Sequence, residues 1–261
     1  MINTKGSTAA TTARQQLRRI LESDQCVFPA SVHDAISARI AEELGFEMGM
    51  LGGSVASLTV LGAPDVILLT LSEFADQVRR ITRGSDLPVF CDADHGYGNA
   101  LNVKRTVEEL ETAGIAGLSI EDTDLPMAFG SNGQKRLLSV EEGVGKIRAA
   151  VAARRDNSLV IAGRTDAAAI TNIEDAIERL VAYEQAGADV LFSVGIKTPE
   201  QLAQLSAATN LPLFVGGLPA TMMDRGVLAD QRVRIALQGH QPFAAGVQAI
   251  YDTVIPWHSL R

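Results

Sequence analysis

The sequence predicts a single (β/α)₈ barrel with a short helix before it, and three observations support this fold class. The chain has 261 residues, a common length for one barrel of this kind. Short apolar runs alternate with amphipathic segments, as expected of repeated β-α units around a buried parallel sheet. The glycine-rich nucleotide loops that favour an open, doubly wound sheet do not occur in the sequence.

The first residues predict a tail rather than part of the barrel. Residues 1–12 are rich in Ser, Thr and Ala and contain no apolar signal-like core, so we expect a flexible tail there and the barrel domain over 13–261. A helix near Arg14–Glu22 is expected to precede the first strand. No stretch has the apolar length that spans a bilayer, which favours a cytoplasmic protein. A short transit peptide is the less favoured alternative because Arg is sparse in the tail.

Eight strands are predicted from the apolar runs. They are Cys26–Ala30, Glu47–Leu51, Pro88–Asp92, Gly117–Glu121, Leu159–Gly163, Asp189–Val194, Leu211–Val215 and Val233–Leu237. Helices are expected after each strand, and glycines that follow several of them suit the left-handed turn that closes a helix. The predicted helices are Ser31–Leu44, Ser72–Gly84, Asn102–Ala113, Val140–Ala153, Ile173–Ala186, Pro199–Ala208, Ala220–Ala229 and Pro242–Val254.

The charge pattern points to small molecules as partners. The formal net charge is −8 and the chain has no run of Lys or Arg, which argues against nucleic acid or an anionic membrane as a partner. The two cysteines, Cys26 and Cys91, lie in apolar stretches without metal-ligand spacing and are expected to be buried thiols.

Acidic residues gather at the predicted ends of strands three and four. Asp92 and Asp94 are two residues apart and should point to the same side of the sheet, and the next strand ends in Glu121 and Asp122. Carboxylates crowded at the mouth of a barrel repel each other unless a cation intervenes, so Mg²⁺, or alternatively Mn²⁺, is expected here. We expect Asp92 to be the direct ligand and its neighbours to act largely through water. Asp65 follows strand two and is either an outer-shell acid or an exposed loop residue.

Three further strand ends carry candidate substrate-binding residues. After strand two, backbone N–H groups around Gly53, Ser54 and Val55 could hold an anionic oxygen, although a plain tight turn is an equal alternative. Arg164 ends strand five, where it could bind a substrate carboxylate or a neighbouring acid. His240 ends strand eight, where it could form a hydrogen bond or transfer a proton. His95 could support the metal site, whereas His258 lies near the terminus.

These motifs resemble the isocitrate lyase and phosphoenolpyruvate mutase superfamily, whose members act on α-oxycarboxylates bound to Mg²⁺. The resemblance extends from about Ser31 to His240, and it is closest to the oxaloacetate decarboxylase family. It is carried, in family order, by G-G-S at 52–54, D-A-D-H-G-Y-G-N at 92–99, S-I-E-D at 119–122, E-E-G-V-G-K-I at 141–147, G-R-T-D-A at 163–167 and G-H at 239–240.

The resemblance implies roles for the candidate residues. Asp92 would bind Mg²⁺, and Asp94, Glu121 and Asp65 would hold its water shell. Ser54, Arg164 and His240 match positions that bind substrate. It further implies a homotetramer, although an exchanged C-terminal helix is in doubt because the chain stops at residue 261.

This chain lacks a loop cysteine that the carbon–carbon lyases of the superfamily carry. Those enzymes carry a K-[KR]-C-G-H loop after the S-I-E-D strand, and its Cys serves as an acid. Here the corresponding segment, 125–135, contains no Cys, which disfavours a 2-methylisocitrate-type lyase. Asn132 and Lys135 in the same segment leave a phosphonopyruvate hydrolase open.

The expected reaction is therefore Mg²⁺-assisted decarboxylation of a 2-oxo dicarboxylate such as oxaloacetate. The metal would polarise the 2-oxo group, and donors near Ser54 would stabilise the enolate that remains after CO₂ leaves. Arg164 and His240 would hold the carboxylates, and the proton donor to the enolate is unassigned. Less favoured alternatives are a Schiff-base aldolase using Lys197 and a catalytically silent metabolite-binding barrel.

Overall fold

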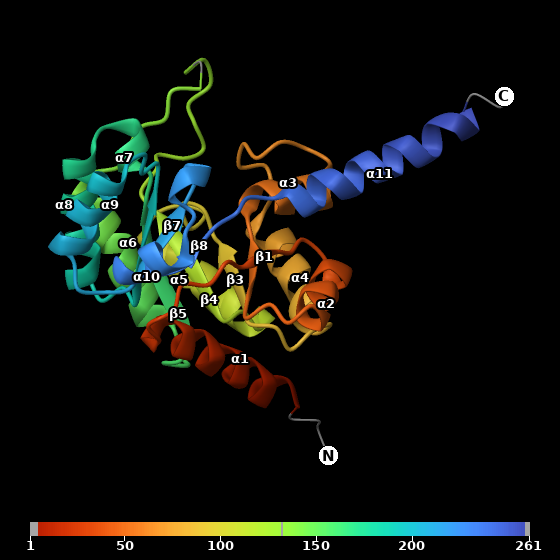
Figure 1. The fold of residues 1–261 in the computed structure, drawn as a ribbon, viewed down its shortest axis with the longest axis horizontal. Helices are drawn as coiled ribbons and strands as arrows, with labels where there is room; N and C mark the ends of the chain where they lie inside the picture. The colour runs from red at the N-terminus through yellow and green to blue at the C-terminus, as the bar shows by residue number, and fades with distance from the viewer. Residues whose placement is uncertain (1–4, 132, 259–261) are drawn as a thin grey trace.

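The computed structural model describes residues 5–131 and 133–258, and within them the predicted barrel is confirmed (Figure 1). Eight parallel strands pair in sequence order. They are β1 (Ala30–Ser31), β2 (Gly49–Leu51), β3 (Val89–Asp92), β4 (Gly117–Glu121), β5 (Val160–Thr165), β6 (Val190–Val194), β7 (Leu213–Gly216) and β8 (Val233–Ala236). The ring closes through Val27, whose N–H donates to the Arg234 carbonyl at 2.9 Å and whose carbonyl accepts from the Ala236 N–H at 3.0 Å.

The first strand differs from its prediction over Cys26–Ala30. Val27 pairs with β8, whereas β1 begins only at Ala30 and pairs with β2. Pro29 lies between these two pairings, and because proline has no N–H it cannot extend a ladder. The predicted strand is therefore two short pieces that join different neighbours.

Helices surround the strands and mostly match the predicted segments. They are α1 (Lys5–Glu22), α2 (Ala35–Glu43), α3 (Gly53–Leu61), α4 (Leu71–Thr82), α5 (Ala100–Ala113), α6 (Val140–Ala153), α7 (Ala167–Ile170), α8 (Ile173–Gln185), α9 (Pro199–Ala208), η1 (Ala220–Met222), α10 (Arg225–Asp230) and α11 (Gln241–His258). The sequence did not predict α3 and α7, and the helix predicted over Ala220–Ala229 is broken into η1 and α10. Asp224 caps α10 by accepting a hydrogen bond from the Val227 N–H at 2.9 Å, which explains the new start there.

The predicted tail over residues 1–12 is wrong for the part that the structure describes. Helix α1 already begins at Lys5, while residues 1–4 lie outside the described residues. Leu17 and Leu21 of α1 are buried against the end of the barrel opposite the strand carboxyl ends. Arg14 anchors the helix through hydrogen bonds to the Glu111 and Ile115 carbonyls at 2.7 and 3.0 Å. Burial of one helical face thus orders a segment whose composition alone resembles a tail.

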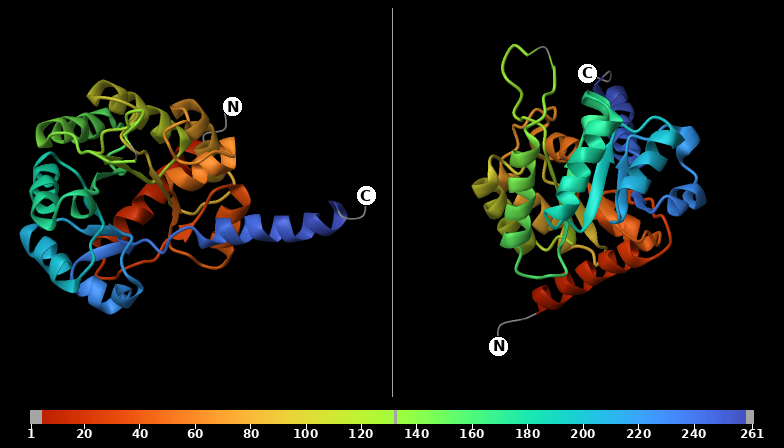
Figure 2. Two further views of the ribbon diagram at one scale, coloured as in Figure 1. Left: turned by 90° about the horizontal axis from the view of Figure 1, so that it is seen from above. Right: turned by 90° about the vertical axis from the view of Figure 1, so that its left-hand side faces the viewer.

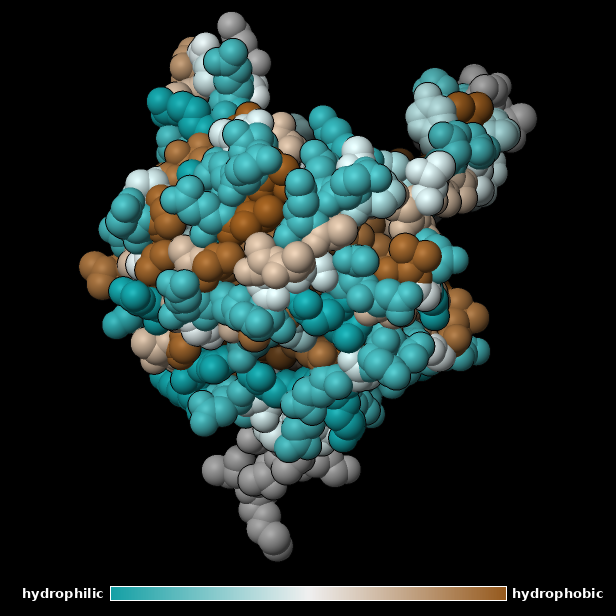
Figure 3. Space-filling view, turned by 60° about the vertical axis from the view of Figure 1, so that its left-hand side comes forward, coloured by the Kyte–Doolittle hydropathy of each residue, from teal (hydrophilic) through white to brown (hydrophobic). Residues whose placement is uncertain are grey.

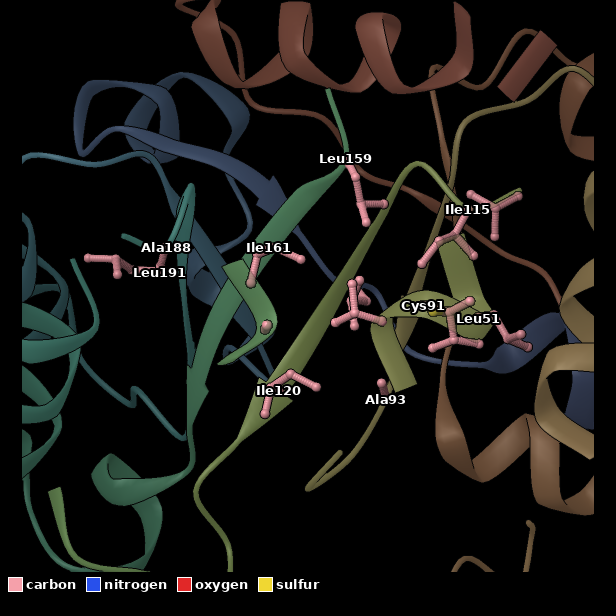
Figure 4. Packing of buried hydrophobic residues seen from close by; sticks show 14 of the residues in the cluster. Leu51, Cys91, Ala93, Ile115, Ile120, Leu159, Ile161, Ala188 and Leu191 are labelled. Carbon is pink, nitrogen blue, oxygen red and sulfur yellow. The ribbon is translucent and has the colours of Figure 1, made fainter. Parts of the chain in front are cut away.

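The core has two layers, because successive side chains of a strand point to opposite faces. The inner layer fills the barrel with residues such as Phe90, Phe192 and Phe214. The outer layer packs the strands against the helices, and Figure 4 shows part of it, including Ile120 and Ile161. Both cysteines are buried thiols, as predicted. This alternation decides which strand residues can reach the mouth of the barrel.

Two segments project from the rounded body (Figures 2 and 3). One is the loop between β4 and α6, which stands up from the carboxyl ends of the strands and carries a fully exposed Phe129. The other is α11, which extends away from the barrel and buries none of its own residues. Within the described residues, no helix combines the length and apolar character needed to cross a membrane.

Candidate active site

The predicted acidic residues come together in a small cavity at the carboxyl ends of the strands. Asp92 ends β3, Asp94 follows it, Glu121 ends β4, and Asp65 approaches from the segment after α3. All four line a cavity of about 150 Å³, together with the cations Arg164 and Lys135. Residues from several chain segments meet there because the strands are parallel and in register.

Arg164 is at the centre of this cluster. Its guanidinium forms ion pairs with Asp92, with Glu121 at 3.0 Å between Nη2 and Oε2, and with Asp166 at 3.1 Å between Nη2 and Oδ1. It also lies 5.3 Å from the centre of the Phe192 ring, which supports it from below as a cation–π partner. The structure therefore gives Arg164 the neighbouring acids as partners, one of the two alternatives left by the sequence.

Hydrogen bonds from β4 and from the turn after β3 hold the Asp92 carboxylate in place. Its Oδ1 accepts a hydrogen bond from the Ser119 hydroxyl at 2.9 Å and one from the Asp94 N–H at 3.3 Å, while Oδ2 faces Arg164. Asp94 itself has a positive φ of 48°, a conformation that few residues other than glycine adopt. The turn after β3 thus aims both carboxylates at the same cavity.

The electrostatics of the cavity favour an additional cation. Burial, opposed by Arg164 and reinforced by Asp92, raises the pKa of Glu121 to about 7. Burial and the neighbouring carboxylates also raise the pKa values of Asp94 and Asp65. Four acids line the cavity against only two cationic side chains, and both cations are also paired with Asp166, so negative charge is in excess there.

The residues present suit Mg²⁺, although they form no complete cage. Among the described residues, no three His, Cys, Asp or Glu side chains already converge as a ligand set. Mg²⁺ keeps several waters and takes only one or two carboxylates directly, so a full protein cage is not required. Glu121 Oε2 is buried and lies 3.0 Å from Arg164 Nη2, but no hydrogen bond of good geometry is formed there, so this oxygen retains capacity to accept one from a metal-bound water. The direct role of Asp92 and the indirect roles of its neighbours stay predictions.

A second cavity adjoins the first and contains the predicted anion-binding segment. It has a volume of about 390 Å³, shares Asp65, Asp92 and Arg164 with the acidic cavity, and is also lined by Ser54 and His240. Apolar side chains also line this cavity. They are Met50, Phe192, Val194, Leu218 and Leu237.

The glycine pair after β2 begins a helix instead of forming a plain turn. Gly52 is the N-cap of α3, and the first helical hydrogen bond runs from the Ala56 N–H to the Gly52 carbonyl at 3.0 Å. The N–H groups of Gly53, Ser54 and Val55 therefore precede the helical bonding pattern and are suited to an anion. The sequence missed the helix because two consecutive glycines are a usual sign of a turn.

The two glycines also make room for different neighbours. A Cβ on Gly52 would lie 2.6 Å from His240 Nε2, and a Cβ on Gly53 would lie 2.8 Å from Asp94 Oδ1. Either contact would force the neighbouring side chain to move. The bare backbone therefore allows the histidine on one side and the acidic cluster on the other to approach the start of α3 closely.

His240 lies between β8 and α11, at the predicted mouth of the barrel. Its Nδ1 is 2.7 Å from the Ser31 hydroxyl oxygen at the end of β1. Burial lowers the pKa of His240 despite the opposing field of Asp92, which favours the neutral ring. The sequence did not single out Ser31, because a lone Ser at a strand end carries no distinguishing signal.

The comparisons with known proteins agree with this geometry. A family model described as phosphoenolpyruvate phosphomutase matches residues 17–255. The chain belongs to this family. It is 60% identical over 241 residues to proteins named oxaloacetate decarboxylase from Bradyrhizobium sp. (strain ORS 278) and Rhodopseudomonas palustris (strain ATCC BAA-98 / CGA009), covering 92% of this chain and 83% of each relative.

Solved structures of the phosphoenolpyruvate phosphomutase family superpose well on the barrel. An oxaloacetate acetylhydrolase in complex with the inhibitor 3,3-difluorooxalacetate has a TM-score of 0.85 and 31% identity, covering 94% of this chain and 86% of that one. A phosphonopyruvate hydrolase complex with oxalate and Mg²⁺ has a TM-score of 0.81 and 29% identity, covering 95% and 87%. The family resemblance proposed from the motifs is confirmed.

Asp122 does not belong to the acidic cavity, contrary to the prediction of a cluster of four that included it. It is buried on the opposite face of β4, where its Oδ2 accepts hydrogen bonds from Tyr183 at 2.6 Å and from Thr165 and Arg179 at 3.0 Å each. Neighbouring strand residues point to opposite faces, so Glu121 and Asp122 cannot both reach the mouth. The place of Asp122 in the cluster is taken by Asp65.

The structure also shows where the remaining polar residues considered in the sequence analysis lie. Lys135, noted from the sequence only in the loop after the fourth strand, lies 3.2 Å from Asp166 and lines the acidic cavity. Asp166, part of the G-R-T-D-A motif, was not predicted as a site residue. His95 is buried, and its carbonyl accepts a hydrogen bond from the Lys146 ammonium at 2.9 Å. Lys197, the lysine expected to serve a Schiff-base aldolase, is exposed and lines neither cavity, which argues against it in that role. His258 is exposed near the end of α11, and Asn132 lies outside the described residues.

Proposed function

We propose that this protein catalyses the Mg²⁺-dependent decarboxylation of oxaloacetate to pyruvate and CO₂. The observation that carries the proposal is the pair of joined cavities, with carboxylates for a cation on one side and donors for an anion on the other. Relatives with 60% identity are named oxaloacetate decarboxylase, and they supply the substrate that geometry alone leaves open. A doubly negative substrate needs a cation in this acidic cavity, because the carboxylates would otherwise repel it.

We propose that Asp92 holds the metal directly and that Asp94, Glu121 and Asp65 hold its waters. All four side chains reach the same cavity, and oxygen donors suit Mg²⁺ or Mn²⁺. Bound there, the ion would act as a Lewis acid that polarises the 2-oxo group of the substrate. Arg164 keeps the acids in position through its three ion pairs and presents its guanidinium to the shared wall of the two cavities.

The remaining residues bind the substrate. The N–H groups of Gly53, Ser54 and Val55 at the start of α3 would donate to anionic oxygen, where negative charge collects as CO₂ leaves. His240, beside the start of α3, would hold the distal carboxylate. The apolar side chains that line the cavity would exclude water from that carboxylate, and a desolvated carboxylate is more readily lost as neutral CO₂.

The loop after β4 favours decarboxylation over carbon–carbon lysis. The segment 125–135 has no Cys that could act as the lyase acid, and its Phe129 stands in solvent. Lys135 reaches the cluster from the base of this loop. A phosphonopyruvate hydrolase is the alternative that product analysis must exclude, since a family member of that name shares the barrel.

The test is to measure pyruvate formation from oxaloacetate with a lactate dehydrogenase couple, in Mg²⁺ and in EDTA. Because free Mg²⁺ itself promotes this reaction, the control is the same mixture with an Asp92→Ala variant. We expect turnover that EDTA stops and Mg²⁺ restores. Metal-independent turnover would refute the mechanism, and oxalate instead of pyruvate as product would indicate carbon–carbon hydrolysis.

We further propose that the protein is a homo-oligomer, and the resemblance favours a tetramer. On α11 the side chains of Val247, Ile250, Tyr251 and Val254 are all exposed and follow the spacing of one helical face. An apolar stripe on a projecting helix suits packing against another subunit. Light scattering should give a mass above that of the 27.7 kDa chain, and a Tyr251→Asp variant should lower it; a monomeric parent would refute the proposal.

A further inference from the structure

Ser31 and His240 join the two ends of the barrel sheet at its mouth. Ser31 ends β1 and His240 follows β8, and the Ser31 Oγ lies 2.7 Å from His240 Nδ1. No other hydrogen bond involves the Ser31 side chain among those found in the described part of the chain. One of the two ring nitrogens is thus occupied by a neutral hydroxyl, which can donate or accept.

The other ring nitrogen lies close to the start of α3. His240 Nε2 lies against Gly52, where a Cβ would come within 2.6 Å of it, and both residues line the larger cavity together with Gly53 and Ser54. The imidazole therefore presents Nε2 beside the N–H groups at the start of α3. A hydrogen on Nε2 would add one more N–H donor to those at the start of α3, whereas an unprotonated Nε2 would present a lone pair that repels an anion.

The position of His240 relative to the metal site defines which part of the substrate it meets. Asp94 and Glu121 line only the acidic cavity, and His240 lines only the larger one, while Asp92 and Arg164 border both. A dicarboxylate whose oxo end lies near the shared acids extends its distal carboxylate toward His240. This placement of the substrate rests on the proposed function.

We propose that Ser31 is a positioning residue: its hydroxyl donates to His240 Nδ1, fixes the tautomer with hydrogen on Nε2, and so presents an N–H donor to the distal carboxylate. The reverse tautomer would place hydrogen on Nδ1 and turn a lone pair toward a negatively charged group. Burial also lowers the pKa of His240, so the ring is neutral and its tautomer matters. Ser31 acts only through the histidine and does not need to touch the substrate.

The tautomer can be measured without any turnover. Two-bond ¹H–¹⁵N correlations report which nitrogen of each ring is protonated, and the chain has only four histidines. A His240→Gln variant assigns the signal. We expect wild-type His240 to be neutral with its hydrogen on Nε2. A hydrogen on Nδ1 in the wild type would overturn the proposal, whether or not the protein proves to be a decarboxylase.

Kinetics then test the consequence. Replacing Ser31→Ala should raise KM for oxaloacetate about three- to tenfold, the size expected for one hydrogen bond, with little change in kcat. The conservative Ser31→Thr variant retains a hydroxyl and should restore KM. Inhibition by oxalate should be unchanged in both variants, because oxalate has no distal carboxylate. A merely structural role would instead lower thermal stability or the active fraction and leave KM unchanged.

Two results would overturn the proposal even if the protein decarboxylates oxaloacetate. One is an unchanged KM in a folded Ser31→Ala variant, and the other is an equal loss of affinity for oxalate and oxaloacetate. If wild-type protein forms no pyruvate, the proposed function fails, while the ring tautomer still decides whether Ser31 sets the donor. The two failures are therefore distinguishable.

Discussion

Two clusters of charged residues occupy opposite faces of the same two strands, and they differ in what surrounds them. On the inner face, Glu121 of β4 and Arg164 of β5 meet Asp92 beside an open cavity. On the outer face, the next residues along each strand, Asp122 and Thr165, are hydrogen-bonded to each other under the helices. We call these the mouth cluster and the outer cluster.

The outer cluster is closed, whereas the mouth cluster is open. Asp122 Oδ2 accepts three hydrogen bonds, including those from Arg179 and Tyr183 of α8, and the Arg179 guanidinium also binds the Leu138 carbonyl at the end of the projecting loop. This ties strand, helix and loop together. The mouth cluster has similar residue types but faces space that can admit a metal ion and a substrate. The two clusters differ in access to a cavity rather than in residue composition. This access makes the mouth cluster a candidate site, whereas the outer cluster has a structural role.

The largest expected difference between the clusters concerns activity. Replacing Asp92→Ala should reduce kcat/KM more than about a thousandfold, because loss of a supporting residue around a metal already costs roughly 10- to 100-fold. Stability should change by less than about 1 kcal/mol, since Arg164 keeps Glu121 and Asp166 as partners. Steady-state assays and urea unfolding check both. Activity close to that of the parent would refute Asp92 as the ligand.

The outer cluster should show the opposite response. Replacing Asp122→Ala leaves the Arg179 and Tyr183 donors without their buried acceptor and should lower the free energy of unfolding by about 3 kcal/mol. The melting temperature should fall by on the order of 10 °C. The matched Tyr183→Phe variant, which removes one hydrogen bond, should lose only about 1 kcal/mol. A stable Asp122→Ala protein without activity would reverse the assignment of the two clusters.

Two glycines, one beside each cluster, extend the comparison to the backbone. A Cβ on Gly52 would collide with His240 at the mouth, whereas a Cβ on Gly163 of β5 would lie 2.8 Å from the Tyr183 Cβ in the outer layer. Gly52→Ala should therefore lower kcat/KM about tenfold, since small displacements of a binding group are costly. Gly163→Ala should instead lower the melting temperature. Equal effects of both variants on stability, with unchanged kinetics, would contradict a separate role for the mouth.

The last expected effect is the pH dependence of stability without metal. The pKa of Glu121 is raised to about 7 from 4.5, so the folded state binds its proton more tightly than the unfolded state does. Stability should therefore fall as pH rises from about 4.5 to about 7, by at most about 3 kcal/mol, since one pKa unit corresponds to about 1.4 kcal/mol. Urea unfolding in EDTA at several pH values should show this slope, and Glu121→Gln should reduce it, while Asp94 and Asp65, whose pKa values are also raised, keep the remainder. Mg²⁺ should offset the loss near pH 7; a slope of opposite sign would contradict the prediction.

Much of the fold follows from local sequence patterns. The strand Gly117–Glu121 and the helices Val140–Ala153 and Pro199–Ala208 lie at their predicted bounds, because apolar periodicity and capping residues act within a few positions. Helix α3 was missed because its first turn contains Gly53, and α1 began earlier than predicted because its order depends on burial of Leu17 against the barrel. Local rules fail where distant contacts decide the outcome.

Strand-end motifs are enough to predict the barrel, the family and most of the mouth cluster, since parallel strands deliver their carboxyl ends to one place whatever the details of packing. The outward direction of Asp122 also follows from a local rule, the alternation of side chains along a strand. By contrast, the place of Asp65 in the cavity and the contact of Ser31 with His240 depend on how distant segments pack, and no local pattern encodes contacts between residues as far apart as 31 and 240.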